Sequence, residues 1–304
     1  MTDRSRAPAL VLLLQVLLLP CGLRAQGSPD TKAPPTAPAS QKPEPAPAAG
    51  AKLAEWPALK ETDKERVFSL AGQFRKADPK LREEAKQQLI ALGDSAMPLL
   101  LQQVSDSDKD ESFNAHLFCV FDEALKPTHA NLMARESKKP RVTLRRYLFL
   151  RMCRFVDPDL LPVLKAGCKE KDEPTAYYAS LGMLALKERE AVPAVIAYTK
   201  TRWKEVGAIT AEVLPAARSV DAGNWVFEAI AKAPAADQMA GLRLERYLAV
   251  KEHYVIMRTY LNASEHTVKK EAVNTMRVLH GEAPIENLNV FDAIQMAQAW
   301  LKKI

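Results

Sequence analysis

The chain has 304 residues, of which 47% are hydrophobic, 26% charged and only 7% aromatic. A chain of this length and composition can bury a sizeable core, which excludes a wholly disordered protein. Its four cysteines are too few for a small disulfide-rich scaffold, and no apolar run reaches the length of about 18 residues that a membrane-spanning helix requires. A pure membrane protein is therefore excluded as well, and the composition favours a helical protein.

The first 25 residues have the features of an export signal. Two arginines among the first six residues precede an apolar stretch over residues 9–19, which only Gln15 interrupts. This length is typical of a signal peptide and too short for a bilayer span. We expect cleavage between Ala25 and Gln26, and hence a secreted or periplasmic protein. The alternatives are an uncleaved anchor and a lipoprotein attached at Cys21, against which the preceding Pro20 argues.

Cleavage would remove three arginines and one aspartate and lower the formal net charge from +6 to +4. A charge this small does not require a nucleic-acid partner, and export would separate the protein from chromosomal DNA. We therefore predict no nucleic acid and no stable membrane span in the mature chain. Acidic proteins and anionic envelope polymers remain as long-range partners.

A low-complexity segment follows the signal. Residues 26–50 contain seven prolines and six alanines and no aromatic residue, so they offer nothing to bury and favour an extended conformation. We predict a disordered linker over residues 26–55 that holds the next domain away from a membrane or wall. A proline-rich ligand for a small recognition domain is the alternative.

From residue 56 to residue 304 the apolar residues recur with helical periodicity. The first clear pair of helices covers residues 81–92 and 97–104, and Gly93 and Asp94 can end the first helix and cap the second. Met97-Pro98, Leu161-Pro162 and Val192-Pro193 then recur at separations that correspond to a unit of about 32 residues. We predict seven antiparallel helix pairs after a lead-in helix over residues 62–76, for which Thr62 and Glu65 have the spacing of a capping box. Strand signals are few, so the domain is predicted to be all-α.

Residues 82–100, which begin Arg-Glu-Glu-Ala and end Ala-Met-Pro-Leu-Leu, resemble a HEAT repeat of the bacterial HEAT-like type. The resemblance is good over residues 174–198, fair over 144–169 and only periodic after Trp203, where Pro215 falls in a first helix and predicts a kink or a displaced boundary. It implies a right-handed superhelical solenoid over residues 56–304, with the second helices lining its concave face. Proteins of this family are mostly scaffolds and binding surfaces, and the repeat supplies no catalytic residue.

Sequence-local signatures of chemistry are missing. The five histidines show no zinc spacing, and the chain has no nucleophile elbow, no phosphate-binding loop and no dinucleotide-binding glycines. We predict no catalytic residue, no metal ligand and no cofactor, and we expect the histidines at the surface or at helix ends. Cys119, Cys153 and Cys168 are expected as buried thiols, with a Cys119–Cys153 disulfide as the alternative.

Two groups of residues are candidates for binding. Eight basic residues oppose a single acid over residues 135–154, and we take five of them as candidate partner-binding residues. These are Lys138, Lys139, Arg141, Arg145 and Arg146. Because they point to different sides of a helix, a solvated loop is the competing interpretation. An aromatic platform of Tyr177, Tyr178, Tyr198 and Trp203 competes with burial of these rings in the core, which we favour.

The sequence as a whole predicts a non-catalytic protein–protein interaction scaffold that is exported and is not an enzyme. Stacked helix pairs form a continuous core and an extended surface suited to this role. The alternatives are a module that binds envelope polysaccharides, and a HEAT-like enzyme with a pocket on the concave face. An enzyme would show a convergent cluster of ionisable groups with perturbed pKa values in one pocket, whereas a scaffold would show a broad groove without one.

Overall fold

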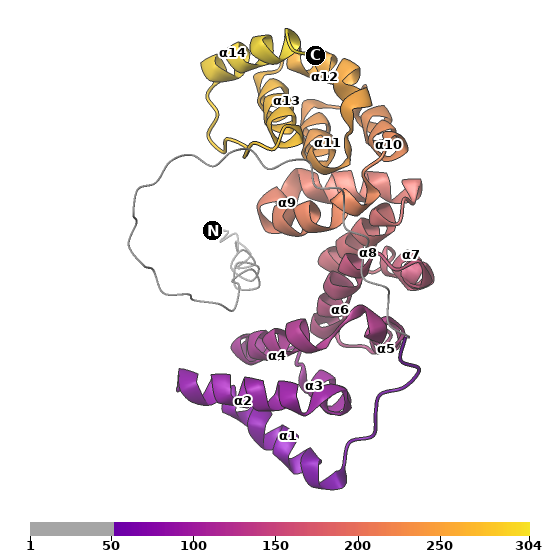
Figure 1. Ribbon diagram of the computed structural model, residues 1–304, viewed down its shortest axis with the longest axis vertical. Coiled ribbons are helices and arrows are strands. Elements are labelled where there is room, and N and C mark those ends of the chain that lie inside the picture. Colours follow the sequence, from indigo (N-terminus) through magenta and orange to yellow (C-terminus); the bar gives the residue numbers. More distant parts are fainter. Residues whose placement is uncertain (1–51) are drawn as a thin grey trace, which may run out of the picture.

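The computed structural model describes residues 52–304 (Figure 1). The predicted signal peptide, the cleavage site between Ala25 and Gln26, the alternative lipid site Cys21 and most of the predicted linker lie outside the described residues. The described part contains fourteen α-helices and no strand, which confirms the all-α prediction and is compatible with a helical repeat fold.

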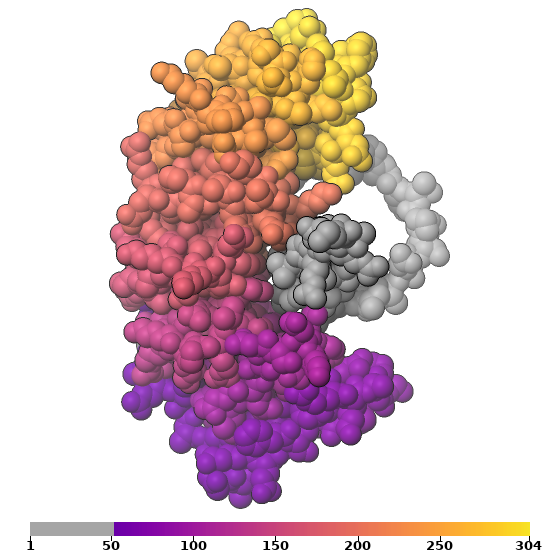
Figure 2. Space-filling model, turned by 180° about the vertical axis from the view of Figure 1, so that it is seen from behind, coloured from indigo at the N-terminus to yellow at the C-terminus, as the bar shows by residue number. Residues whose placement is uncertain are grey.

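The helices follow one another along the long axis of the molecule, so that α1 and α14 lie at opposite ends (Figure 1). Seen from behind, their side chains form successive bands in sequence order (Figure 2). The helices are α1 (Glu61–Gln73), α2 (Pro79–Ala91), α3 (Met97–Gln103), α4 (Glu111–Ala124), α5 (Ala130–Glu136), α6 (Val142–Phe155), α7 (Leu161–Gly167), α8 (Glu173–Ala185), α9 (Val192–Val213), α10 (Val220–Ile230), α11 (Ala235–Leu248), α12 (Tyr254–Leu261), α13 (His266–Leu279) and α14 (Val290–Leu301).

The order of elements divides into a lead-in helix and seven pairs when α9 is counted twice. This helix bends at Arg202, whose backbone angles (φ −124°, ψ 23°) are not helical, and so joins the second helix of one pair to the first helix of the next. The displaced boundary expected around Pro215 is a short 3₁₀ turn, Leu214–Ala217, that follows α9. Proline is tolerated there because the first turn leaves its backbone nitrogen without a partner in any case.

Local capping explains several helix starts, although not always at the expected residue. Asp78 caps α2 by accepting a hydrogen bond from Lys80 N at 2.8 Å, and Pro79 occupies the first turn. The predicted capping box at Thr62 is absent, because α1 begins one residue earlier at Glu61 and its N-cap, Lys60, makes no side-chain bond.

Two histidines cap helix pairs at related places in the repeat. The Nδ1 atoms of His129 and His253 accept hydrogen bonds from the backbone N–H of Lys126 and Val250, each at 3.0 Å. Both side chains are almost completely buried, and the two residues directly precede α5 and α12 as their N-caps. The expected location at helix ends is therefore correct for them, but they belong to the core and not to the surface.

The core is continuous from α1 to α14 and depends on close approach between the first helices of successive pairs. At Gly182 of α8, a Cβ atom would lie 3.1 Å from the Cα of Cys153 in α6. The described residues contain no disulfide among Cys119, Cys153 and Cys168. Burial raises the pKa of the Cys153 thiol to about 12, so this thiol is an inert core group.

The start of the described chain packs against the middle of the molecule. The Lys52 ammonium lies 2.6 Å from Asp157 and 2.5 Å from Asp159, and the backbone N–H of Leu53 donates to Thr128 O at 2.9 Å. The Trp56 ring stacks on His129 at a centroid distance of 5.4 Å. Ordered contacts thus include the last residues of the predicted linker.

Among residues 52–304, no helix combines the length and the apolar character that crossing a membrane requires.

Candidate functional site

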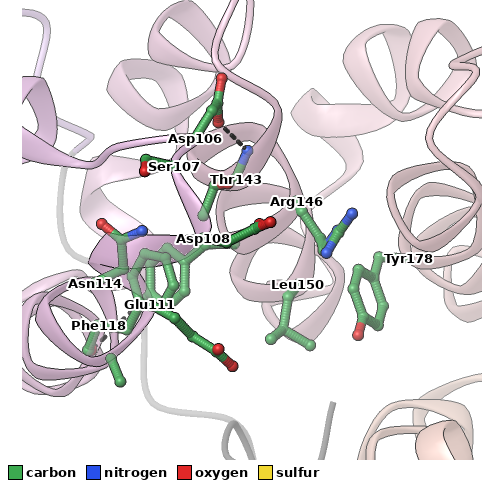
Figure 3. Close-up of a pocket in the computed structure, with 12 residues that line it drawn as sticks. Asp106, Ser107, Asp108, Glu111, Asn114, Phe118, Thr143, Arg146, Leu150 and Tyr178 are labelled. Carbon is green, nitrogen blue, oxygen red and sulfur yellow. Dashed lines mark hydrogen bonds between the residues drawn. The ribbon is translucent and has the colours of Figure 1, made fainter. Parts of the chain in front are cut away.

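A cavity of about 80 Å³ lies between the loop before α4 and the helices α4, α6 and α8, and we call it the α4–α6–α8 pocket. Figure 3 shows its lining. Asp108 comes from the 3₁₀ turn before α4 and Glu111 from the first residue of α4, and Arg146, Leu150 and Tyr178 face them from α6 and α8. Three successive helix pairs therefore contribute to one site.

Stacked aromatic rings form the apolar wall of this pocket. Phe118 of α4 lies parallel to Tyr147 of α6, with ring centroids 4.3 Å apart and an interplanar angle of 4°. The Tyr147 hydroxyl donates to Asp122 Oδ1 at 2.9 Å, and burial raises the pKa of this phenol well above its usual value. These bonds fix the wall, since a buried tyrosine whose hydroxyl is paired is held in one orientation.

The one guanidinium in the lining is already neutralised. Arg146 binds Asp172 through two bonds, Nε to Oδ2 at 3.2 Å and Nη2 to Oδ1 at 2.6 Å. Asp172 also caps α8 by accepting from Thr175 N at 3.1 Å. Burial alone would raise the pKa of Asp172, but the bonds from Arg146 and Thr175 outweigh it and hold the pKa below its usual value.

The loop that carries the acidic side of the pocket is pinned to α6. Asp106 accepts from Val142 N at 3.2 Å and from Thr143 N at 2.8 Å and so caps α6 from a distant segment; the bond to Thr143 is dashed in Figure 3. Burial alone would raise the pKa of Asp106, but these bonds outweigh it and lower the pKa. Asn114 holds the loop from the other side by accepting from Ser105 N at 3.0 Å and donating to Ser105 O at 2.7 Å.

Three polar groups of the pocket have no partner within the described chain. Asp108 and Glu111 make no ion pair or hydrogen bond through their carboxylates with any described residue. Tyr178 is 6% exposed, and residues 52–304 offer its hydroxyl no hydrogen bond. Burial raises the pKa of Tyr178, so the phenol stays protonated and can both donate and accept.

The five basic candidates are separated by the fold. Arg141 donates to the carbonyl of Leu101 at 2.7 Å, at the end of α3. Lys139 pairs with Glu136 at 2.6 Å, and Arg146 belongs to the α4–α6–α8 pocket.

Only two of the five share a cavity. Lys138 and Arg145 line a second cavity of about 570 Å³ between α5, α6 and α7, where Arg145 is paired with Glu170 at 2.9 Å. A partner-binding role for the five residues stays a prediction.

The aromatic residues that could have formed a platform are used for packing. Tyr177 is buried, shares a hydrogen bond of 2.7 Å with the Thr210 hydroxyl and stacks on Tyr198 at 4.6 Å. Trp203 lies beneath the guanidinium groups of Arg243 and Arg246, each 5.5 Å from its ring. The interpretation as core residues is correct for Tyr177 and Tyr178, and Tyr178 has in addition the pocket role that sequence reasoning missed.

The acidic residues of the pocket were also missed by sequence reasoning. The signal that could have pointed to them is the run of acids and serines over residues 105–111, in a loop between two predicted helices. From the local sequence alone, such a run is interpreted as a solvated loop. Only the packing of α6 and α8 turns it toward a cavity.

No family model and no curated protein matches the chain. A search of solved structures found a similarity to human deoxyhypusine hydroxylase in complex with glycerol, with 11% sequence identity and a TM-score of 0.32, over 80% of this chain and 98% of that chain. At these values neither residues nor activity can be carried over to this chain.

The comparison nevertheless corrects two expectations. The protein that was matched is an enzyme, so the expectations of a non-catalytic interaction scaffold and of a chain that is not an enzyme are withdrawn. Both predictions treated the absence of catalytic sequence motifs as the absence of a functional site. A site assembled from three helix pairs leaves no such motif, since its residues are far apart along the chain.

Proposed function

We propose that this protein binds a small molecule in the α4–α6–α8 pocket, and that this pocket is the functional centre of an exported helical-repeat protein of HEAT-like type. Export itself is proposed from the first 25 residues, with cleavage between Ala25 and Gln26. The repeat type is proposed from the resemblance of residues 82–100 and from the succession of helix pairs.

The unpaired hydroxyl of Tyr178 carries the proposal. Tyr178 lines the pocket with a side chain that is otherwise almost fully buried, and no described residue binds its hydroxyl. A ligand in the pocket would supply the missing bond. Concave sites with an apolar wall and a few converging polar groups are the usual form of small-molecule sites.

The same groups could also act on a bound molecule. Asp108 and Glu111 can accept protons as carboxylates, and the protonated phenol of Tyr178 can donate one. The pocket thus combines two carboxylates with a phenol whose pKa is raised by burial, a set of groups that acid–base chemistry could use. This agrees with the alternative interpretation of the sequence as a HEAT-like enzyme with a pocket.

Filling the pocket tests the proposal. Ala115→Phe places a ring in the pocket, whereas Ala208→Phe adds the same ring at an exposed position of α9 and serves as the control. We expect compounds that shift the NMR signals of Leu150 in the wild-type protein to lose binding at least tenfold in Ala115→Phe and to bind the control normally. Mass spectrometry of the bound compounds would detect turnover. Equal binding to both variants would contradict a site in this pocket.

A further inference from the structure

We infer that the ligand of the α4–α6–α8 pocket is an organic cation, a protonated amine or a guanidinium on a short apolar body. This inference rests on the proposed function and adds the chemical class of the ligand. It is carried by the balance of charge in the lining, by the aromatic wall and by the position of Tyr178.

The charge balance of the lining is negative. Asp106, Asp108 and Glu111 line the pocket against one cation, Arg146, and Asp172 already neutralises that guanidinium at 2.6 Å. Asp106 keeps its negative charge while it accepts bonds from Val142 and Thr143. An anion would therefore meet like charges, whereas a cation would meet two carboxylates, Asp108 and Glu111, that have no partner in the described chain.

The walls suit the body of such a ligand. The stacked rings of Phe118 and Tyr147 and the side chain of Leu150 offer apolar contact, and the face of a ring attracts a nearby cation. The cavity of about 80 Å³ has room for a few heavy atoms only, which fits an alkylamine or the end of a longer amine. A long glycan would extend beyond it.

Tyr178 completes the set of hydrogen bonds. An ammonium group carries three donors and no acceptor, so two carboxylates and one phenol oxygen can satisfy it. All three groups line the pocket; in Figure 3 Glu111 and Tyr178 stand on opposite sides of Leu150, and the Asp108 carboxylate is directed toward Arg146. A neutral alcohol could use one of these groups but would leave the carboxylates without a charged partner.

Two matched probes of nearly equal size, butylamine and 1-butanol, test the inference in the mature chain. We expect butylamine to bind at least tenfold more tightly than 1-butanol, with shifts of the Leu150 methyl signals in NMR. In the double variant Asp108→Asn, Glu111→Gln this preference should disappear, and Tyr178→Phe should weaken butylamine several-fold. Glu65→Gln, a change of an exposed carboxylate on α1, is the control and should leave binding unchanged.

The outcomes separate this inference from the proposed function. If both probes bind equally in the pocket, or if acetate binds more tightly than butylamine, the cation inference is overturned while the pocket remains a ligand site. If butylamine binds but the double variant keeps the preference, the carboxylates do not recognise it and the inference is again wrong. If no probe shifts the Leu150 signals and Ala115→Phe has no effect on any ligand, the proposed function itself is contradicted.

Discussion

The α6–α8 and α11–α13 regions use the same chemical groups with opposite results. In the first region Arg146 pairs with Asp172, and their side chains are 26% and 17% exposed beside an open pocket. In the second region Arg246 and Arg243 pair with Glu271, and Arg246 is only 6% exposed above Trp203. An ion pair at an opening leaves neighbouring groups available to a ligand, whereas a sealed one contributes only to the stability of the folded protein.

The sealed region also contains a carboxyl group without a partner. Glu245 of α11 is completely buried, and both of its carboxyl oxygens lack hydrogen bonds within the described chain. Burial raises its pKa well above its usual value. In the α4–α6–α8 pocket, by contrast, the unpaired carboxylates of Asp108 and Glu111 reach open space, where a ligand can approach them.

The largest expected effect is the loss of the buried ion pair. Glu271→Ala leaves two guanidinium groups, one of them almost fully buried, without their carboxylate partner, and we expect the free energy of unfolding to fall by about 3–5 kcal/mol. Asp172→Ala removes a partner from the more exposed Arg146 and the cap of α8, which together should cost only about 2 kcal/mol. Urea denaturation of both variants measures the difference. Equal losses would remove the distinction between the two regions.

The effect expected at Glu245 depends on pH. Because its pKa is raised in the folded protein, the wild type binds an extra proton when folded, and its stability falls as the pH rises above the usual carboxyl pKa of 4.5. Glu245→Gln removes the carboxyl group that causes this loss of stability. The variant should gain stability over the wild type by up to about 1.4 kcal/mol per pH unit until the pH reaches the raised pKa.

Thermal or urea unfolding at several pH values would show this divergence. The control is Glu252→Gln, which changes an exposed carboxylate with no such shift in stability expected. Stability curves that run parallel for wild type and Glu245→Gln would mean that the carboxyl group finds a partner in solution.

The smallest expected effect concerns the cap that links the pocket loop to α6. Asp106→Ala removes the acceptor for the first amides of α6 and should cost about 1 kcal/mol at neutral pH. Since the pKa of Asp106 is lowered in the folded protein, its stabilisation is present above the usual value of 3.8 and is lost as the pH falls through the lowered pKa. The difference between wild type and variant should therefore shrink in acid, as urea unfolding at two pH values would reveal. If the difference in stability between wild type and Asp106→Ala is the same at both pH values, the loss comes from packing and not from the charge of Asp106.

Much of the fold could be predicted from the sequence because its signals are local. The apolar periodicity over residues 81–92 predicts α2 within two residues at its N-terminus. The kinked α9 was harder, because one continuous helix serves two pairs and Arg202 carries no proline or glycine signal. The superhelical arrangement and its handedness remain predictions that the resemblance implies.

The candidate site was predicted only in part. Arg146 was named as a binding residue and does line a pocket, but its charge is neutralised by Asp172, which lies 26 residues away. Lys138 and Arg145 belong to another cavity, and Arg141 is used to hold the end of α3. Neighbouring residues on a helix point about 100° apart, so a run of like charges cannot reveal which of them will meet an acid.

The sequence by itself determined the all-α class, the succession of helix pairs and the bounds of the first helices to within a few residues, since periodicity and caps depend on residues within a few positions of one another. The tertiary structure alone decided which polar groups are satisfied and which are left facing a cavity. Tyr178 is the clearest case, because its sequence context is that of an ordinary core residue. Its exposure to the pocket depends on the packing of α4 and α6 against α8, and this packing joins residues separated by up to 72 positions, from Asp106 to Tyr178.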